Sequence, residues 1–223
     1  MADAVASEIA KWRLWIEGPI RSDVVDMHFK RMMWREVNLM LEANPTVAQS
    51  PSAFWKFLWD SYATAQAIAI RRQADVRRDT CSLGRVITEM SKRADRLTRD
   101  YYVSLLGERS NNELMVQRMN RGFDRLANGA DRLDPKVCAR DLNELADSAR
   151  AVITYVDEHV AHDAVASTTA DLPTYADMHS AVDTIGEVFN KYHVALTGGW
   201  WYTLEPVIQE DWHAIFRLPW LSS

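Results

Sequence analysis

Apolar residues recur at three- and four-residue steps along most of the chain, the spacing that places them on one face of an α-helix. The clearest run follows Pro51-Ser52 and includes Trp55 and Trp59, which we interpret as core residues. Another follows Asp134-Pro135, a capping residue with proline at the first helical position, and continues to about Val160. No segment shows sustained alternation of apolar and polar residues, so no sheet is predicted.

Capping residues define further helices. Ser22 is expected to cap a helix over residues 23–43, and Ser82 to cap a shorter one. Residues 174–177 resemble a capping box that opens a helix ending at Gly198-Gly199. Residues 107–130 are polar and rich in Asn, Arg and Gly, which favours a long connection with one short helix.

The pattern predicts an all-α fold, a single-domain antiparallel bundle of about five to seven helices with a long connection near residues 107–133. We expect residues 1–20 to form a helical extension and residues 21–199 the bundle. Residues 200–223, rich in aromatic side chains, are expected to pack on the bundle as a tail. The tail tryptophans suit either this packing, a dimer interface, or a stacking platform for bases.

Composition narrows the class of protein. The 223 residues are 48% hydrophobic with a net charge of −5, so nucleic-acid binding would need a local patch. Two separated cysteines, Cys81 and Cys138, argue against a disulfide scaffold or a zinc site. No signal peptide or membrane span is evident, and we expect a cytoplasmic protein without membrane contact.

A basic stretch provides such a patch. Residues 71–99 contain nine Lys or Arg and four Asp or Glu, a local charge of +5. One interpretation is a phosphate-binding site on the arginines that flank its first turn: Arg71, Arg72, Arg77 and Arg78. The other is a solvated helix face with four-residue ion pairs, Glu89–Arg93 and Asp95–Arg99.

The densest polar cluster is residues 155–163, with two His and three acids at the end of a long helix. Rigid backbone and nearby solvent suit a catalytic site there. A solvated helix terminus with histidines at the negative end of the dipole is the alternative.

His159-Val160-Ala161-His162-Asp163 resembles the closing segment of the HEPN superfamily of helical domains. The stretch from Phe54-Trp55 to Ser82-Leu83 is similar to the abortive-infection (AbiU-like) branch, and the resemblance covers about residues 25–195. It implies a prokaryotic defence or toxin–antitoxin type system, metal-independent cleavage or binding of RNA or nucleotide, a homodimer, and a cognate antitoxin or defence-system protein as partner.

The resemblance also implies roles for residues. His162 would be the general acid/base, with His159, Asp157 and Arg150 as helpers. Ribonuclease members place an Arg with four to six residues between it and the His, whereas this chain has Tyr, Val and Asp at residues 155–157. An inactive member that acts as an interaction or regulatory module through a dimer interface is therefore the alternative function.

A metal site is the third hypothesis. His179, Asp183 and Glu187 step by four along one predicted helix, which places them on one face as bundle metal sites require. Such sites normally use Glu-x-x-His motifs, and none occurs in the sequence. We therefore expect no metal and no cofactor. Phosphate-binding glycine loops and nucleophile elbows are absent as well.

Overall fold

The computed structural model describes residues 2–50, 52–107, 112–160 and 172–218. These residues form α-helices and no β-strand, which confirms the all-α prediction. Among the described residues, seven helices have ten residues or more: α1 (Ala2–Trp15), α2 (Arg21–Ala43), α4 (Ala53–Ala74), α5 (Leu83–Lys92), α7 (Glu113–Ala127), α8 (Pro135–Tyr155) and α9 (Tyr175–Thr197). Shorter elements are α3 (Pro45–Ala48), α6 (Arg99–Ser104), the 3₁₀ turns η2 (Ala94–Arg96) and η5 (Trp212–Arg217), and the π-helical turns η1 (Ile16–Ile20) and η4 (Val156–Val160).

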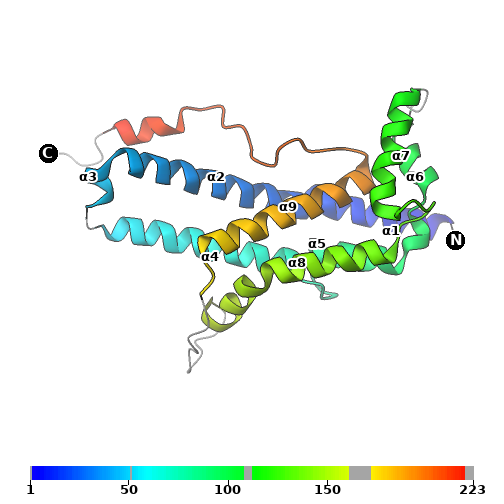
Figure 1. Cartoon of the computed structure of the whole chain (residues 1–223), viewed down its shortest axis with the longest axis horizontal. Helices are drawn as coiled ribbons and strands as arrows, with labels where there is room; N and C mark the ends of the chain where they lie inside the picture. Colours follow the sequence, from blue (N-terminus) through cyan, green and yellow to red (C-terminus); the bar gives the residue numbers. More distant parts are fainter. Residues whose placement is uncertain (1, 51, 108–111, 161–171, 219–223) are drawn as a thin grey trace.

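Four helices form the body of the bundle. α2 and α8 run in one direction, and α4 and α9 run in the opposite direction beside them (Figure 1). Their facing sides supply a continuous core in which Ile70, Val152 and Phe189 are fully buried. α5 adds Val86 and Met90 to this core. No helix in the described part of the chain is long and apolar enough to cross a membrane.

The N-terminal helix continues directly into α2. The expected start at Ser22 is wrong, because η1 links α1 to α2 and the residue before α2, Ile20, already has helical dihedrals. Gly18, with φ −101° and ψ −105°, and Pro19 bend the chain at this junction. Ile16 and Ile20 are fully buried, and their packing in the main core explains why the helix continues through the bend.

The other predicted caps are confirmed. Ser82 accepts a hydrogen bond from the backbone N–H of Arg85, and Asp134 accepts one from that of Lys136. Thr174 and Asp177 form a reciprocal capping box, with the Thr174 N–H donating to the Asp177 carboxylate at 2.8 Å. These local bonds replace helical partners that the first backbone N–H groups lack.

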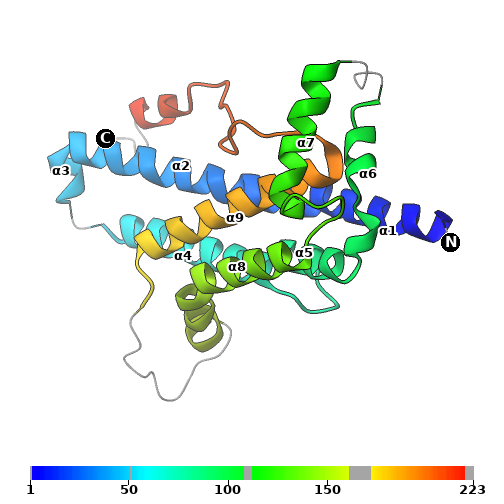
Figure 2. The ribbon, with the colours of Figure 1, turned by 45° about the vertical axis from the view of Figure 1, so that its right-hand side comes forward.

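The expected connection near residues 107–133 is mostly helical, which corrects that part of the prediction. Helix α7 occupies fifteen of these residues, with Asn112 as its cap. Met119 and Phe123, four residues apart, pack with Tyr102 and Ala127 in a small second cluster. Charged and glycine positions between these apolar residues obscured the helical period. α6 and α7 form a hairpin that stands across one end of the bundle (Figures 1 and 2).

Trp55 and Trp59 are half-buried instead of lying in the core. Their rings stack on each other at 6.4 Å between centroids, and the Trp34 ring of α2 meets Trp59 edge-on at 6.2 Å. They lie on the first turns of α4, where the neighbouring Phe54 and Phe57 are exposed. The rings at this end of the bundle therefore contact one another without being enclosed.

The C-terminal segment runs back beside α2 (Figure 1). Trp201 exchanges two hydrogen bonds with the Asn190 side chain, at 2.8 and 3.1 Å. Leu204 and His28 close over Gly186 of α9, where an added Cβ would lie 2.7 Å from His28 Nε2 and 3.0 Å from Leu204 Cδ1. The absence of a side chain at Gly186 therefore allows this close packing of α2, α9 and the tail.

Candidate functional site

The turn that follows α8 is where the sequence predicts catalysis. η4 carries Asp157, whose carboxylate binds a guanidinium from another helix. Nε of Arg71, on α4, donates to Oδ1 of Asp157 at 2.7 Å. The side chains of Arg71 and Asp157 are 37% and 47% exposed, so this ion pair lies at the surface. The structure thus brings together two site residues that are 86 positions apart in the sequence.

The remaining residues predicted for catalysis are not gathered with this pair. Arg150 forms an ion pair with Asp147 on the same helix, and its side chain is 74% exposed. His162 lies outside the described residues, as does the side chain of His159. The catalytic histidine therefore stays a prediction from the sequence.

The other predicted phosphate-binding arginines surround the end of α4. Arg72 pairs with Asp23 at 3.1 Å, and Arg77 pairs with Asp75 at 2.8 Å. The hydrogen bond that Arg77 donates to the Asp75 carboxylate raises the pKa of Arg77, and the negative charge of Asp157 contributes in the same direction. Arg77 is therefore part of the same electrostatic neighbourhood as the Arg71–Asp157 pair.

The junction between α4 and α5 is tightly built. The Gln73 side chain donates to Asp23 at 2.8 Å and accepts from the Leu83 N–H at 3.0 Å. Gly84 lies against the end of α4, where a Cβ would be 2.9 Å from the carbonyl oxygens of Ala74 and Asp75. Because backbone atoms define this spacing, the segment that carries Arg71 and Arg77 has a fixed position.

Two of the three residues considered for a metal site, His179 and Asp183, have protein partners. Asp183 accepts a hydrogen bond from Arg31 at 2.5 Å, and His179 Nε2 shares one with the Tyr62 hydroxyl at 2.8 Å. Burial lowers the pKa of His179, which favours its neutral form. Burial also lowers the pKa of the neighbouring His28 to about 4. No group of three metal-ligating side chains occurs among the described residues.

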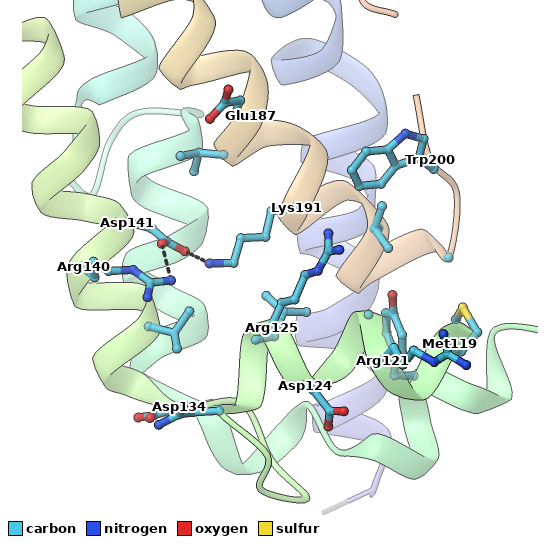
Figure 3. Close-up of a pocket in the computed structure, with 18 of the residues that line it drawn as sticks. Met119, Arg121, Asp124, Arg125, Asp134, Arg140, Asp141, Glu187, Lys191 and Trp200 are labelled. Carbon is cyan, nitrogen blue, oxygen red and sulfur yellow. Dashed lines mark hydrogen bonds and ion pairs between the residues drawn. The ribbon is translucent and has the colours of Figure 1, made fainter. Parts of the chain in front are cut away.

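A cleft that the sequence did not predict opens at the other end of α8 (Figure 3). It lies between α7 on one side and α8 and α9 on the other, with a volume of about 1170 Å³. α7 contributes Arg118, Arg121 and Arg125 to its lining. Their i, i+3, i+7 spacing places them along one side of the helix. This spacing is the feature of the sequence that could have predicted a basic face on α7.

A buried carboxylate lies beneath the cleft. Asp141 is 2% exposed and accepts hydrogen bonds from Lys191 Nζ at 2.6 Å and from the Tyr192 hydroxyl at 2.9 Å. Arg140 approaches its other oxygen at 3.4 Å. Burial raises the pKa of Tyr192, so its hydroxyl remains a donor. These bonds compensate the buried charge and hold Lys191 at the cleft surface.

Comparison with known proteins identifies the family. A family model described as AbiU2, of the HEPN class, matches residues 9–215. No curated protein and no solved structure matches the chain. The match includes α2 to α9, the α4–η4 site and the cleft. The chain therefore belongs to the AbiU2 family of abortive-infection HEPN proteins.

Proposed function

We propose that this protein binds and cleaves RNA in the cytoplasm as part of a prokaryotic defence or toxin–antitoxin type system. The site is the end of α8, and Arg71 of α4 replaces the arginine missing from the motif. The observation that carries the proposal is the 2.7 Å contact between Arg71 and Asp157, which brings a cation to the turn that precedes His162.

The exposure of this pair makes exchange with a phosphate feasible. Ion pairs between exposed side chains contribute only about 0–1 kcal/mol, so opening the Arg71–Asp157 contact costs little. A guanidinium also binds phosphate oxygens bidentately, with stronger charge-assisted hydrogen bonds than a neutral donor makes. An RNA phosphate can therefore compete with Asp157 for Arg71.

The proposed reaction requires no metal. His162 removes the proton of a 2′-hydroxyl, and the 2′-oxygen attacks the adjacent phosphorus while the bond from phosphorus to the 5′-oxygen breaks. A proton delivered to the 5′-oxygen completes the step and leaves a cyclic phosphate and a free 5′-hydroxyl. Arg71 stabilises the charge that develops on the phosphate oxygens.

The test compares three variants of the full chain in an RNA cleavage assay with excess chelator. We expect His162→Ala and Arg71→Ala to lose about 100-fold or more in rate, as removal of a general base or of a charge-stabilising donor does. Arg150→Ala is the matched control, because its guanidinium binds Asp147 on α8, and it should retain the wild-type rate. Full cleavage by His162→Ala would refute the proposed reaction.

A second candidate function is that of an inactive interaction module, since Asp157 already neutralises Arg71. Exposed apolar side chains at one end of the bundle, Val47 at 47% and Phe57 at 65%, suit a homodimer contact or a cognate protein partner. Asp157→Asn distinguishes the two functions. It should strengthen RNA binding several-fold if Arg71 contacts phosphate, and leave RNA binding unchanged in an interaction module.

A further inference from the structure

The α7 wall of the cleft presents positive charge without partners. Arg118, Arg121 and Arg125 form no ion pair with any described residue, and all three are exposed. Arg118 and Arg125 are seven residues apart on one side of α7, a separation of about 10 Å along the axis. This row of three arginines suits a ligand that carries several negative charges along its length.

The opposite wall of the cleft contributes a further cation, Lys191. Lys191 of α9 turns toward Asp141 of α8, whereas Arg125 of α7 extends toward α9 on the side of Trp200 (Figure 3). Lys191 shares its charge with Asp141, but 21% of its side chain remains exposed to the cleft. Asp141 therefore balances much of the charge of Lys191, whereas the α7 arginines have no such carboxylate partner in the described part of the chain.

Most of the acids in the lining are already engaged. Asp124 binds Arg99 at 2.7 Å, Asp141 binds Lys191, and Asp134 caps α8. The two others, Glu144 and Glu187, are exposed residues of α8 and α9, on the wall opposite α7. The arginine row and the exposed part of Lys191 therefore define an anion-binding side of the cleft.

Apolar atoms supply the second half of the site. Met119 and Val188 line the cleft, and Trp200 leaves 63% of its side chain exposed beside Arg125. A flat ring can stack on this indole while phosphate groups reach the guanidinium groups. A volume of about 1170 Å³ accommodates a small molecule of this kind.

We propose that this cleft binds a soluble ligand with a chain of phosphoryl groups, held by Arg118, Arg121, Arg125 and Lys191. The ligand is either a nucleoside polyphosphate, with its base on Trp200, or an inorganic polyphosphate. Asp141 and Asp157 are sixteen residues apart along α8 and η4, about 24 Å in a helix. The cleft is thus separate from the proposed RNA site, and its ligand does not depend on RNA cleavage.

Calorimetric titration of the full chain at low ionic strength tests the proposal. The probes are tripolyphosphate, ATP and a short RNA of no defined sequence. The double variant Arg121→Ala/Arg125→Ala should bind tripolyphosphate and ATP about tenfold more weakly or worse, because it loses the charge-assisted hydrogen bonds of two guanidinium groups. Arg132→Ala is the matched control, because this exposed arginine lies between α7 and α8 but outside the cleft, and it should bind both probes as the wild type does.

Trp200→Ala separates the two sources of phosphate. If this variant binds ATP more weakly but tripolyphosphate as the wild type does, the ligand is a nucleoside polyphosphate. If the variant binds both probes as tightly as the wild type does, the ligand is an inorganic polyphosphate. The proposal is overturned if neither probe binds, if the double variant binds as tightly as Arg132→Ala, or if only RNA binds. The double variant should still cleave RNA at the wild-type rate. Loss of phosphate binding in the cleft would then be independent of the proposed reaction at His162.

Discussion

The basic stretch at residues 71–99 and the three arginines of α7 differ in what their charges contact. Seven of the nine cations in the stretch form ion pairs: Arg71, Arg72, Arg77, Arg85, Arg93, Arg96 and Arg99. The α7 arginines form none with the described residues. A count of charge along the sequence favours the first region, whereas the second is the region in which every guanidinium group lacks an ion pair with the described residues.

Four of these seven cations, Arg71, Arg72, Arg93 and Arg99, pair with carboxylates from distant parts of the chain. Arg93 binds Glu8 instead of Glu89, and Arg99 binds Asp124 and Asp131 instead of Asp95, so the expected four-residue pairs are wrong. α1 and α7 approach these arginines only after folding. Paired charge therefore contributes to the structure here, and unpaired charge is available for ligands.

Among the variants that test this comparison, Glu89→Ala should lower the free energy of unfolding the most. Glu89 accepts hydrogen bonds from Lys11, at 2.5 Å, from the Trp12 indole, at 2.9 Å, and from Arg85. Its loss leaves the mostly buried Arg85 without a carboxylate, and we expect the free energy of unfolding to fall by about 2–4 kcal/mol. Urea unfolding measures this change, and a loss below about 0.5 kcal/mol would contradict the structural role of the paired charges.

The same group predicts a dependence on pH. Burial alone would raise the pKa of Glu89, but the hydrogen bonds from Lys11, Trp12 and Arg85 lower it to about 2. A lowered carboxyl pKa stabilises the fold above the ordinary value of 4.5, and this contribution is lost as pH falls toward 2. The difference in stability between wild type and Glu89→Gln should therefore shrink over this interval. A constant difference would place the pKa of Glu89 at its ordinary value.

Arg121→Ala should have the smallest effect on stability. Because Arg121 is exposed and forms no ion pair within the described ranges, its removal should change the free energy of unfolding by less than about 0.5 kcal/mol. Urea unfolding of this variant beside Glu89→Ala checks the contrast between the two regions. A loss comparable to that of Glu89→Ala would show that the α7 arginines also hold the structure together.

Local signals predicted much of the fold. Thr174 with Asp177, and Asp134 with Pro135, define helix starts through bonds within three residues, so the sequence suffices to locate them. The helix of residues 113–127 was predicted only as one short helix in a long connection, because its apolar positions are spaced among arginines, asparagines and a glycine. Its stability depends on Tyr102, a residue of the neighbouring helix.

The candidate site was predicted only in part for a similar reason. A short segment of sequence predicted both the family and a site at the end of α8. The match to the family model confirms the family. That Arg71 approaches Asp157 depends on how α4 packs beside η4, across 86 residues. The spacing of residues within one helix cannot reveal a contact between two helices. The Arg-His motif therefore lacks its arginine in the sequence, although the guanidinium of Arg71 lies beside Asp157 in the folded chain.

Gly186 has a consequence for how this chain tolerates change. A methyl group there would meet His28 and Leu204 at once, so even alanine would force these side chains, or the segments that carry them, to shift. A substitution at position 186 would therefore disturb the packing of the segment around Leu204, eighteen residues later in the chain. Engineering that extends or replaces the C-terminal segment should keep glycine at 186 and a side chain no larger than leucine at 204.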